Sequence, residues 1–272
     1  MRLVPRADRR IPPRLALALL AAAAAAAAIL GGLWMAAPDV SWLRSATPRT
    51  TALLEQRRAE ARAARRPFDA HLRFVPLERI SPRLVEAVIL SEDAGFFGHG
   101  PFDLGELRQA VAQSLHARRW VRGASTLTQQ LAKNLFLGTE RSLWRKAREA
   151  VLAVKLEQAL DKRRILVLYL NVAEWGDGVF GAEAAARARF GVSAPELDTA
   201  QAALLAAMLP APRRADLAAP SPWLRRRSRR VLDLLLAVGR VTPEEHAHAS
   251  AELERLLAGP PAEGAEAEPP EE

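Results

Sequence analysis

The sequence predicts a mostly α-helical protein. Helix start and stop signals recur along its central part, whereas the alternating apolar and polar pattern of a half-buried strand is nearly absent. Half of the 272 residues are hydrophobic, which is enough for one domain of moderate size with a real core. We therefore expect helices packed on helices as the main architecture.

The first expected element is a membrane-spanning helix over residues 15–37. This run contains no charged side chain, and as a helix it would extend roughly 34 Å, enough to cross a bilayer core. Residues 1–14 contain five arginines, whereas only Asp39 and Arg44 are charged in the ten residues after the run. The positive-inside rule places the N-terminus in the cytoplasm and the main domain outside it. A cleaved signal peptide is the alternative, because the run is alanine-rich.

The remaining chain divides into three parts by composition. Residues 38–73 are expected to be a connector, with a solvated Arg- and Ala-rich helix over Leu53–Arg65. Residues 74–257 are expected to form the globular domain. Residues 258–272 are rich in Pro, Ala, Gly and Glu and are expected to be a disordered acidic tail.

Helix signals inside the globular part are specific. Ser81 followed by Pro82 indicates an N-cap and a first helical residue. Asp198 with Gln201 three residues later is typical of a capping box, and it opens a helix that a proline at position 210 stops. A further helix is indicated by leucines at a spacing of four: Leu152, Leu156 and Leu160.

Composition also limits the function. The chain has no cysteine, which excludes disulfides and Cys-based zinc sites. The formal net charge is +8, so its surface should favour anions such as nucleic acid, phosphate groups or anionic lipid. A main domain outside the cytoplasm argues against nucleic acid.

The segment GASTLTQQLAKN, residues 123–134, predicts a helix with an unusual polar surface. Leu127, Leu131 and Leu135 form its core stripe. The other faces carry hydroxyls, two adjacent amides, one cation and no acid, a set suited to an anionic or sugar-like ligand. The polar side chains are Ser125, Thr126, Gln129, Gln130, Lys133 and Asn134.

A carboxylate at the end of another helix is a candidate base. On the helix that starts at Pro82, Glu92 falls between Val88 and Ile89 in angle, so it points toward the apolar side. Partial burial there raises its proton affinity and makes it a better base. Capping of a neighbouring helix or pairing with an arginine is the open alternative for Glu92 or Asp93.

A third helix combines cations with an acid. Arg145 and Glu149 are four residues apart, and Lys146 and Glu149 are three apart. A surface ion pair is the simplest interpretation, worth only a few tenths of a kcal/mol. The functional interpretation is a cationic group aimed at a phosphate, with an acid that holds it in position.

Five segments in one order resemble the family-51 glycosyltransferases, the peptidoglycan polymerases of the bacterial envelope. The resemblance covers roughly residues 74–238, and the five together are far more specific than any one of them. No room remains for the transpeptidase domain of bifunctional members, so a monofunctional member is expected. The segments are EDAGFFGH, GASTLTQQLAKN, RKARE, KRRILVLYLN and RSRRVL.

The resemblance implies a lysozyme-like helical large lobe and a small, membrane-associated jaw lobe around Leu104–Val121. It implies polymerisation of lipid II into β-1,4 glycan with inversion and release of undecaprenyl pyrophosphate. Glu92 would be the general base, and Lys133 and Arg145 would bind the donor pyrophosphate. Glu149 would be a second acid that orients the cations. Substrate would be positioned by Ser125, Thr126, Gln129, Gln130 and Asn134, with Lys146, Lys155 and Asp93 as weaker candidates.

The resemblance also implies partners and a location. The expected partners are lipid II, the growing glycan and the bilayer, and no nucleic acid. Association with other cell-wall synthesis or division proteins stays open. The domain would lie on the periplasmic side of the inner membrane. A divalent cation, Mg²⁺ or Mn²⁺, could bridge the pyrophosphate, although no carboxylate cluster specifies a metal site.

Two alternatives and one departure remain. A lytic transglycosylase or muramidase would share the fold and the catalytic Glu but would cleave glycan, and an inactive envelope scaffold would keep only the helices. The departure is in the first segment, which usually continues H-x-G-F-D. Here Gly100 comes one place early and Pro101 takes the usual glycine position, so the loop path there is uncertain.

Overall fold

The computed structural model describes residues 13–70, 72–117, 125–140 and 142–258. Most of these residues lie in α-helices, which confirms the predicted fold class. The helices are α1 (Pro13–Ala36), α2 (Ala52–Ala63), α3 (Pro82–Glu92), α4 (Leu104–Ala117), α5 (Leu127–Phe136), α6 (Leu143–Ala159), α7 (Lys162–Val172), α8 (Ala182–Phe190), α9 (Thr199–Met208), α10 (Pro222–Ala237) and α11 (Pro243–Ala258).

Short elements connect the helices. Strands β1 (Glu174–Gly176) and β2 (Val179–Phe180) form a small antiparallel hairpin after α7. Gly181 ends it with φ of +85°, and a Cβ there would lie 2.7 Å from the carbonyl oxygen of Asn171, so only glycine fits. The 3₁₀ helices are η1 (Ser41–Arg44), η2 (Leu77–Arg79), η3 (Ala194–Glu196) and η4 (Pro212–Arg214).

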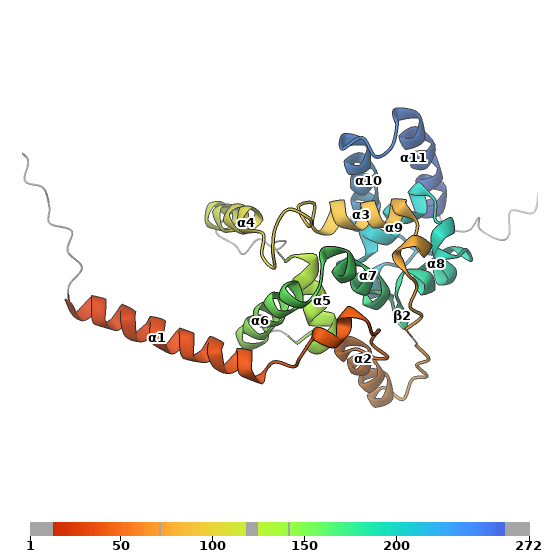
Figure 1. Cartoon of the computed structure of the whole chain (residues 1–272). Coiled ribbons are helices and arrows are strands. Elements are labelled where there is room, and N and C mark those ends of the chain that lie inside the picture. Colours follow the sequence, from red (N-terminus) through yellow and green to blue (C-terminus); the bar gives the residue numbers. More distant parts are fainter. Residues whose placement is uncertain (1–12, 71, 118–124, 141, 259–272) are drawn as a thin grey trace, which may run out of the picture.

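Helix α1 extends away from the helical body (Figure 1). Its Arg14–Ala36 stretch is long and apolar enough to cross a membrane. The expected membrane helix is therefore present, and the protein is a membrane-anchored one. The N-terminal residues 1–12 and the acidic residues 259–272 lie outside the described residues, so the expectations for them stay predictions.

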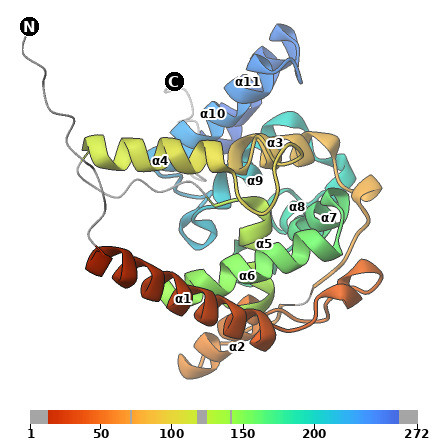
Figure 2. The same ribbon diagram turned by 60° about the vertical axis from the view of Figure 1, so that its left-hand side comes forward.

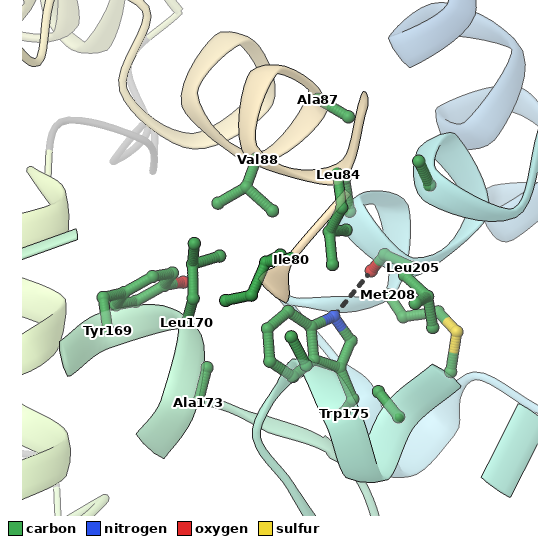
Figure 3. Close-up of a cluster of buried hydrophobic side chains, with 14 of the residues drawn as sticks. Ile80, Leu84, Ala87, Val88, Tyr169, Leu170, Ala173, Trp175, Leu205 and Met208 are labelled. Atoms are coloured by element: carbon green, nitrogen blue, oxygen red, sulfur yellow. Dashed lines mark hydrogen bonds between the residues drawn. The ribbon is translucent and has the colours of Figure 1, made fainter. Parts of the chain in front are cut away.

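The centre of the C-terminal half is α9. Every residue of this helix from Ala202 to Met208 is buried, and the helix packs against α3, α10 and α11. Trp175 of the hairpin packs beside it and donates from Nε1 to the carbonyl oxygen of Leu205 at 3.1 Å (Figure 3). The predicted capping box of Asp198 and Gln201 is confirmed, with both reciprocal hydrogen bonds present.

A second group of helices centres on α5, which packs against α2, α6 and α7. The predicted leucine stripe of α5 is confirmed as a core face, since Leu127 and Leu131 are fully buried and Leu135 nearly so. Leu152 and Leu156 of α6 are buried as expected, and Leu160 is the residue directly after the end of the helix. Helices α5, α6 and α7 share one hydrophobic core with α9 and its neighbours, whereas Leu53 and Leu54 of α2 belong to a second, smaller cluster.

The predicted start of α3 is confirmed, but its capping mechanism is different. Pro82 is the first helical residue and Ser81 is the N-cap. The hydroxyl of Ser81 makes no bond to the helix and instead donates to the carbonyl oxygen of Leu197 at 2.8 Å. Ser81 thus links α3 to the segment before α9.

The connector prediction was wrong about α2. Leu53, Leu54 and Ala61 are buried, so this helix is no solvated rod. Arg57 of α2 links the helix to the hairpin by pairing with the buried carboxylate of Glu174 at 2.9 Å. In the sequence, the many arginines made the whole helix look solvated and concealed its apolar positions. Their long side chains leave one face of the helix free, and that face packs on α5.

Helix α4 projects from the same side of the body as α1 (Figures 1 and 2). Its stripe of Leu104, Leu107 and Val111 is exposed, as expected for a segment that meets a membrane. The expected jaw residues Arg118, Arg119 and Trp120 lie outside the described residues.

Replacement of Arg57 tests how firmly α2 is fixed. Arg57→Ala leaves the carboxylate of Glu174 buried without its cation, so we expect the free energy of unfolding to fall by about 3 kcal/mol. The measurement is denaturation of the detergent-solubilised protein. Arg62→Ala, an exposed arginine of the same helix, should change stability by no more than about 0.5 kcal/mol. Equal small losses would show that α2 is held by its leucines alone.

Candidate active site

The candidate side chains gather around helix α5. Its leucine stripe faces the core, and its polar flank is met by the C-terminal end of α3, by α6 and by α7, while α10 contacts the end of α3. Gln130 is the contact to α3 and α7, and Gln129 is the contact to α6. One helix therefore brings the predicted base and the predicted cations to the same place.

Glu92 ends α3 with only 9% of its side chain exposed. One carboxylate oxygen accepts from Nη2 of Arg227 on α10 at 2.6 Å, and the other accepts from Nε2 of Gln130 at 3.1 Å. Burial raises the pKa of Glu92, and the Arg227 cation and the Gln130 amide only partly offset this. The result is a fixed carboxylate with more affinity for a proton than an exposed glutamate has.

The orientation of Gln130 is set from α7. The hydroxyl of the buried Tyr169 donates to Oε1 of Gln130 at 3.0 Å, which leaves the amide nitrogen to face Glu92. Burial raises the pKa of Tyr169 well above its usual value, so the phenol keeps its proton and remains a donor. Tyr169 is thus a positioning residue behind Gln130.

Glu149 organises the cations of α6. It is 3% exposed and accepts from Nη1 of Arg145 at 2.5 Å and from Nζ of Lys146. This is the i, i+4 and i, i+3 pattern expected from the sequence, but in a buried setting rather than at the surface. Nε of Arg145 is buried and has no hydrogen-bond partner among the described residues, so this guanidinium has a donor left for a ligand.

Lys133 of α5 lies between Glu92 and the charged cluster of Arg145, Lys146 and Glu149. Burial lowers its pKa; the charges of Glu149 and Glu92 raise it, while Arg145 and Lys146 lower it further. A buried ammonium among other cations is costly without an anion. A bound anion would offset that cost and favour the charged form.

Several predicted substrate-binding side chains have partners in the protein itself. Ser125 and Thr126 precede α5 instead of lying on it, a correction to the expected helix start. Thr126 caps the helix by accepting from the amide of Gln129, and its hydroxyl donates to the carbonyl oxygen of Pro101 at 2.9 Å. Lys146 donates to Ser125 and to Gln129, at 3.0 and 3.3 Å.

Asn134 lies in the last turns of α5 and is 6% exposed. Thr126 and Gln129 are equally buried, at 3% and 5%. These three side chains are therefore largely inaccessible in this conformation, whereas Ser125 and Lys146 are more accessible. Their roles toward a substrate stay predictions.

The loop after α3 is fastened by Asp93. Its carboxylate accepts from the amide of Leu127 at 2.8 Å and bonds Nε2 of His99 at 2.6 Å. Burial lowers the pKa of His99, but the hydrogen bonds to Asp93 and Gly100 and the charge of Asp93 together outweigh it, so the pKa is raised overall. The departure at Pro101 is accommodated here, because the bond from Thr126 uses its carbonyl and needs no amide proton.

Sequence reasoning missed Arg227 and Tyr169 as site residues. Both stand in quoted segments, RSRRVL and KRRILVLYLN, so the signal was present. The weaker candidate Lys155 lies elsewhere: its Nζ donates to the carbonyl oxygen of Ala37 at the end of α1, at 2.8 Å.

The described residues do not provide a metal centre. No group of three or more His, Asp or Glu side chains among them could hold an ion. Glu149, the acid beside Lys133, already binds Arg145 and Lys146.

Comparison with known proteins identifies the family. The sequence profile of the transglycosylase family matches residues 60–236. The chain belongs to the transglycosylase family. Proteins named biosynthetic peptidoglycan transglycosylase are 43% identical in Nitrosospira multiformis, 49% in Laribacter hongkongensis and 48% in Bordetella pertussis. The alignments cover 73%, 69% and 70% of this chain and 86%, 82% and 79% of those relatives, respectively.

These comparisons confirm the predicted enzyme class of this transglycosylase, a peptidoglycan glycosyltransferase, and its place in peptidoglycan synthesis. They do not favour the lytic alternative, because the similar proteins are named as biosynthetic enzymes. The family match begins at residue 60, inside α2, which agrees with the packing of that helix on α5.

The Arg145–Glu149 pair allows a test by double-mutant cycle. Arg145→Ala should lower kcat by about 10²-fold, since it removes a cation aimed at developing charge. If Glu149 acts by orienting Arg145, the loss caused by Glu149→Gln should be largely absorbed in the double variant. The measurement is single-turnover glycan synthesis at saturating substrate. Additive losses would show that Glu149 acts independently of Arg145.

Proposed function

We propose that this enzyme polymerises lipid II, with Glu92 as general base and Lys133, Arg145 and Lys146 as the binding site of the leaving pyrophosphate. The observation that carries the proposal is the placement of one buried, partnered carboxylate and one group of cations along the same helix, α5. A glycosyl transfer to a sugar hydroxyl needs both at once: a base for the hydroxyl proton and cations for the departing phosphate.

The proposed reaction is a single displacement with inversion. The 4-hydroxyl of the acceptor GlcNAc loses its proton to the carboxylate of Glu92 while its oxygen forms a bond to C1 of the donor MurNAc. The bond from C1 to the phosphate oxygen breaks, and undecaprenyl pyrophosphate leaves with the electron pair. Arg227 and Gln130 keep the carboxylate of Glu92 in place for this step.

The leaving group gains negative charge as the bond breaks, which is where the cations act. Arg145 and Lys146 are held by Glu149, so little reorganisation is needed when the charge develops. Lys133 is buried and short of compensating charge, so the pyrophosphate stabilises its charged form in return. Glycan hydrolysis has no anionic leaving group of this kind and would not need these three cations.

The membrane orientation follows from the charge pattern around α1. We propose that residues 1–14, with their five arginines, lie in the cytoplasm and that the catalytic domain lies on the periplasmic side. The exposed stripe of α4, Leu104, Leu107 and Val111, supports contact with the same membrane face.

A divalent cation carried by the pyrophosphate stays a prediction. Chelation of Mg²⁺ and Mn²⁺ during the assay would test it.

The proposed function is tested by incubating the detergent-solubilised protein with labelled lipid II. We expect polymer that muramidase degrades. Glu92→Gln should reduce the rate by about 10²-fold or more, because the amide keeps the shape of the side chain but accepts no proton.

Glu86→Gln is the matched control, since Glu86 lies on the same helix and faces Arg83 and Arg240 instead of the site. It should polymerise at nearly the wild-type rate. Shortening of preformed glycan without polymer from lipid II would contradict the proposal, and a fully active Glu92→Gln enzyme would remove Glu92 from its role.

The pH profile reports on Arg227. A general base works only as the carboxylate, so activity is lost as the pH falls through the pKa of Glu92. Arg227 lowers that pKa, so Arg227→Gln should move the acid limb of kcat/KM to higher pH, by about one unit. Arg226→Gln, an exposed neighbour without an ion pair among the described residues, should leave the limb in place. An unmoved limb in Arg227→Gln would refute the electrostatic coupling.

A further inference from the structure

A small groove separates the end of the membrane helix α1 from the first half of α6. Its volume is about 150 Å³. Trp144, Arg148 and Leu152 recur along one stripe of α6, and the end of α1 with its following turn forms the opposite wall. The lining residues that the argument uses are Leu33, Ala36, Pro38, Trp144, Arg148 and Leu152.

The two walls of this α1–α6 groove are held together. Nζ of Lys155 donates to the carbonyl oxygen of Ala37 at 2.8 Å and lies 5.1 Å from the ring centroid of Trp34. Leu33 is 6% exposed although it belongs to a helix that is otherwise largely uncovered. The groove is therefore a preformed feature of the fold at the point where the membrane segment ends.

The groove joins the membrane side of the protein to the candidate site. Its walls are mostly apolar, and the exposed Leu143 and Trp144 continue that apolar surface, at 92% and 57% exposure. Arg148 follows Arg145 by three residues, so the two are neighbours on the surface of α6. Arg148 has no ion pair among the described residues, which leaves its charge for a ligand.

We propose that the α1–α6 groove binds the polyisoprenyl chain of the donor, over the units nearest the pyrophosphate, with Arg148 beside the phosphate end. This inference rests on the proposed function, because the chain is attached to the pyrophosphate that Arg145 and Lys146 bind. A mostly apolar groove beside a membrane helix, with Arg148 in its lining one helical turn from Arg145, fits a molecule that is apolar at one end and anionic at the other.

The size of the groove fits a short stretch of chain. Pockets for whole drug-sized molecules measure roughly 300–1,000 Å³, whereas this one is well below that range. The rest of the chain would remain in the bilayer. The groove therefore fixes where the lipid enters the site, and it holds α6 and its cations at a set distance from the membrane surface.

The experiment uses a donor that cannot act as acceptor, a lipid II analogue with the 4-hydroxyl of its GlcNAc inverted. Donors with a long and a short polyisoprenyl chain are compared at a fixed concentration of one acceptor. Ala36→Phe places a ring in the groove, and we expect about a tenfold rise in KM for the long-chain donor, the scale of one or two buried methylene groups lost. Its kinetics with that donor should approach those of the wild-type enzyme with the short-chain donor.

Met35→Phe is the matched control. Met35 precedes Ala36 on α1 but is 84% exposed and does not line the groove. The Met35→Phe enzyme should therefore prefer the long-chain donor as strongly as the wild-type enzyme does. Melting curves of both variants verify that each is folded. The proposal would be overturned if Ala36→Phe kept the preference for the long-chain donor, because bulk lipid alone would then receive the chain. It would also be overturned if Ala36→Phe lost activity equally with both donors. Absence of any product from wild-type enzyme would instead reject the proposed function.

Discussion

Helix α5 has to bury its leucines in the core and turn its amides toward the neighbouring helices on the same two turns. Leu127 and Leu131 fix the rotation of the helix in the core, and this rotation aims Gln129 toward α6 and Gln130 toward α3 and α7. The hydrophobic effect thus sets the positions of polar groups that it does not itself stabilise. A rotation of α5 that exposed its leucines would separate the carboxylate of Glu92 from the cation group.

The site carries charges in places where charge is expensive. Glu92, Glu149 and Lys133 are all largely buried, and each is tolerated because a partner offsets part of the desolvation. The compensation is incomplete for two of them, since burial still raises the pKa of Glu92 and lowers that of Lys133. The raised pKa favours proton uptake by the base, and a bound anion would in turn favour the charged form of Lys133; a glycosyl transfer from a pyrophosphate requires both a base and an anion-binding cation.

Local patterns predicted the helices well because the determinants are local. The capping box at Asp198 and the leucine stripe of α5 could be read from spacing alone. The packing of α2 could not, because α2 packs on α5 and its Arg57 pairs with Glu174, both of which lie far from it in the sequence. Arg227 stands in the quoted segment RSRRVL, but its partner Glu92 lies 135 residues away, so the contact between them could not be read from spacing.

The anchor and the chemistry share one helix. On α6 one stripe holds the end of α1 through Lys155 and Leu152, and an adjacent stripe carries Arg145 and Glu149. If Arg145 and Lys146 bind the pyrophosphate of a donor that stays in the bilayer, as proposed, their height above the membrane decides whether they meet the phosphates, because such a donor can move only laterally and by the reach of its head group. A flexible tether would leave that height undefined. A helix packed directly on α6 defines it, which is a physical reason for the membrane segment to be part of the active-site scaffold and not merely a means of attachment.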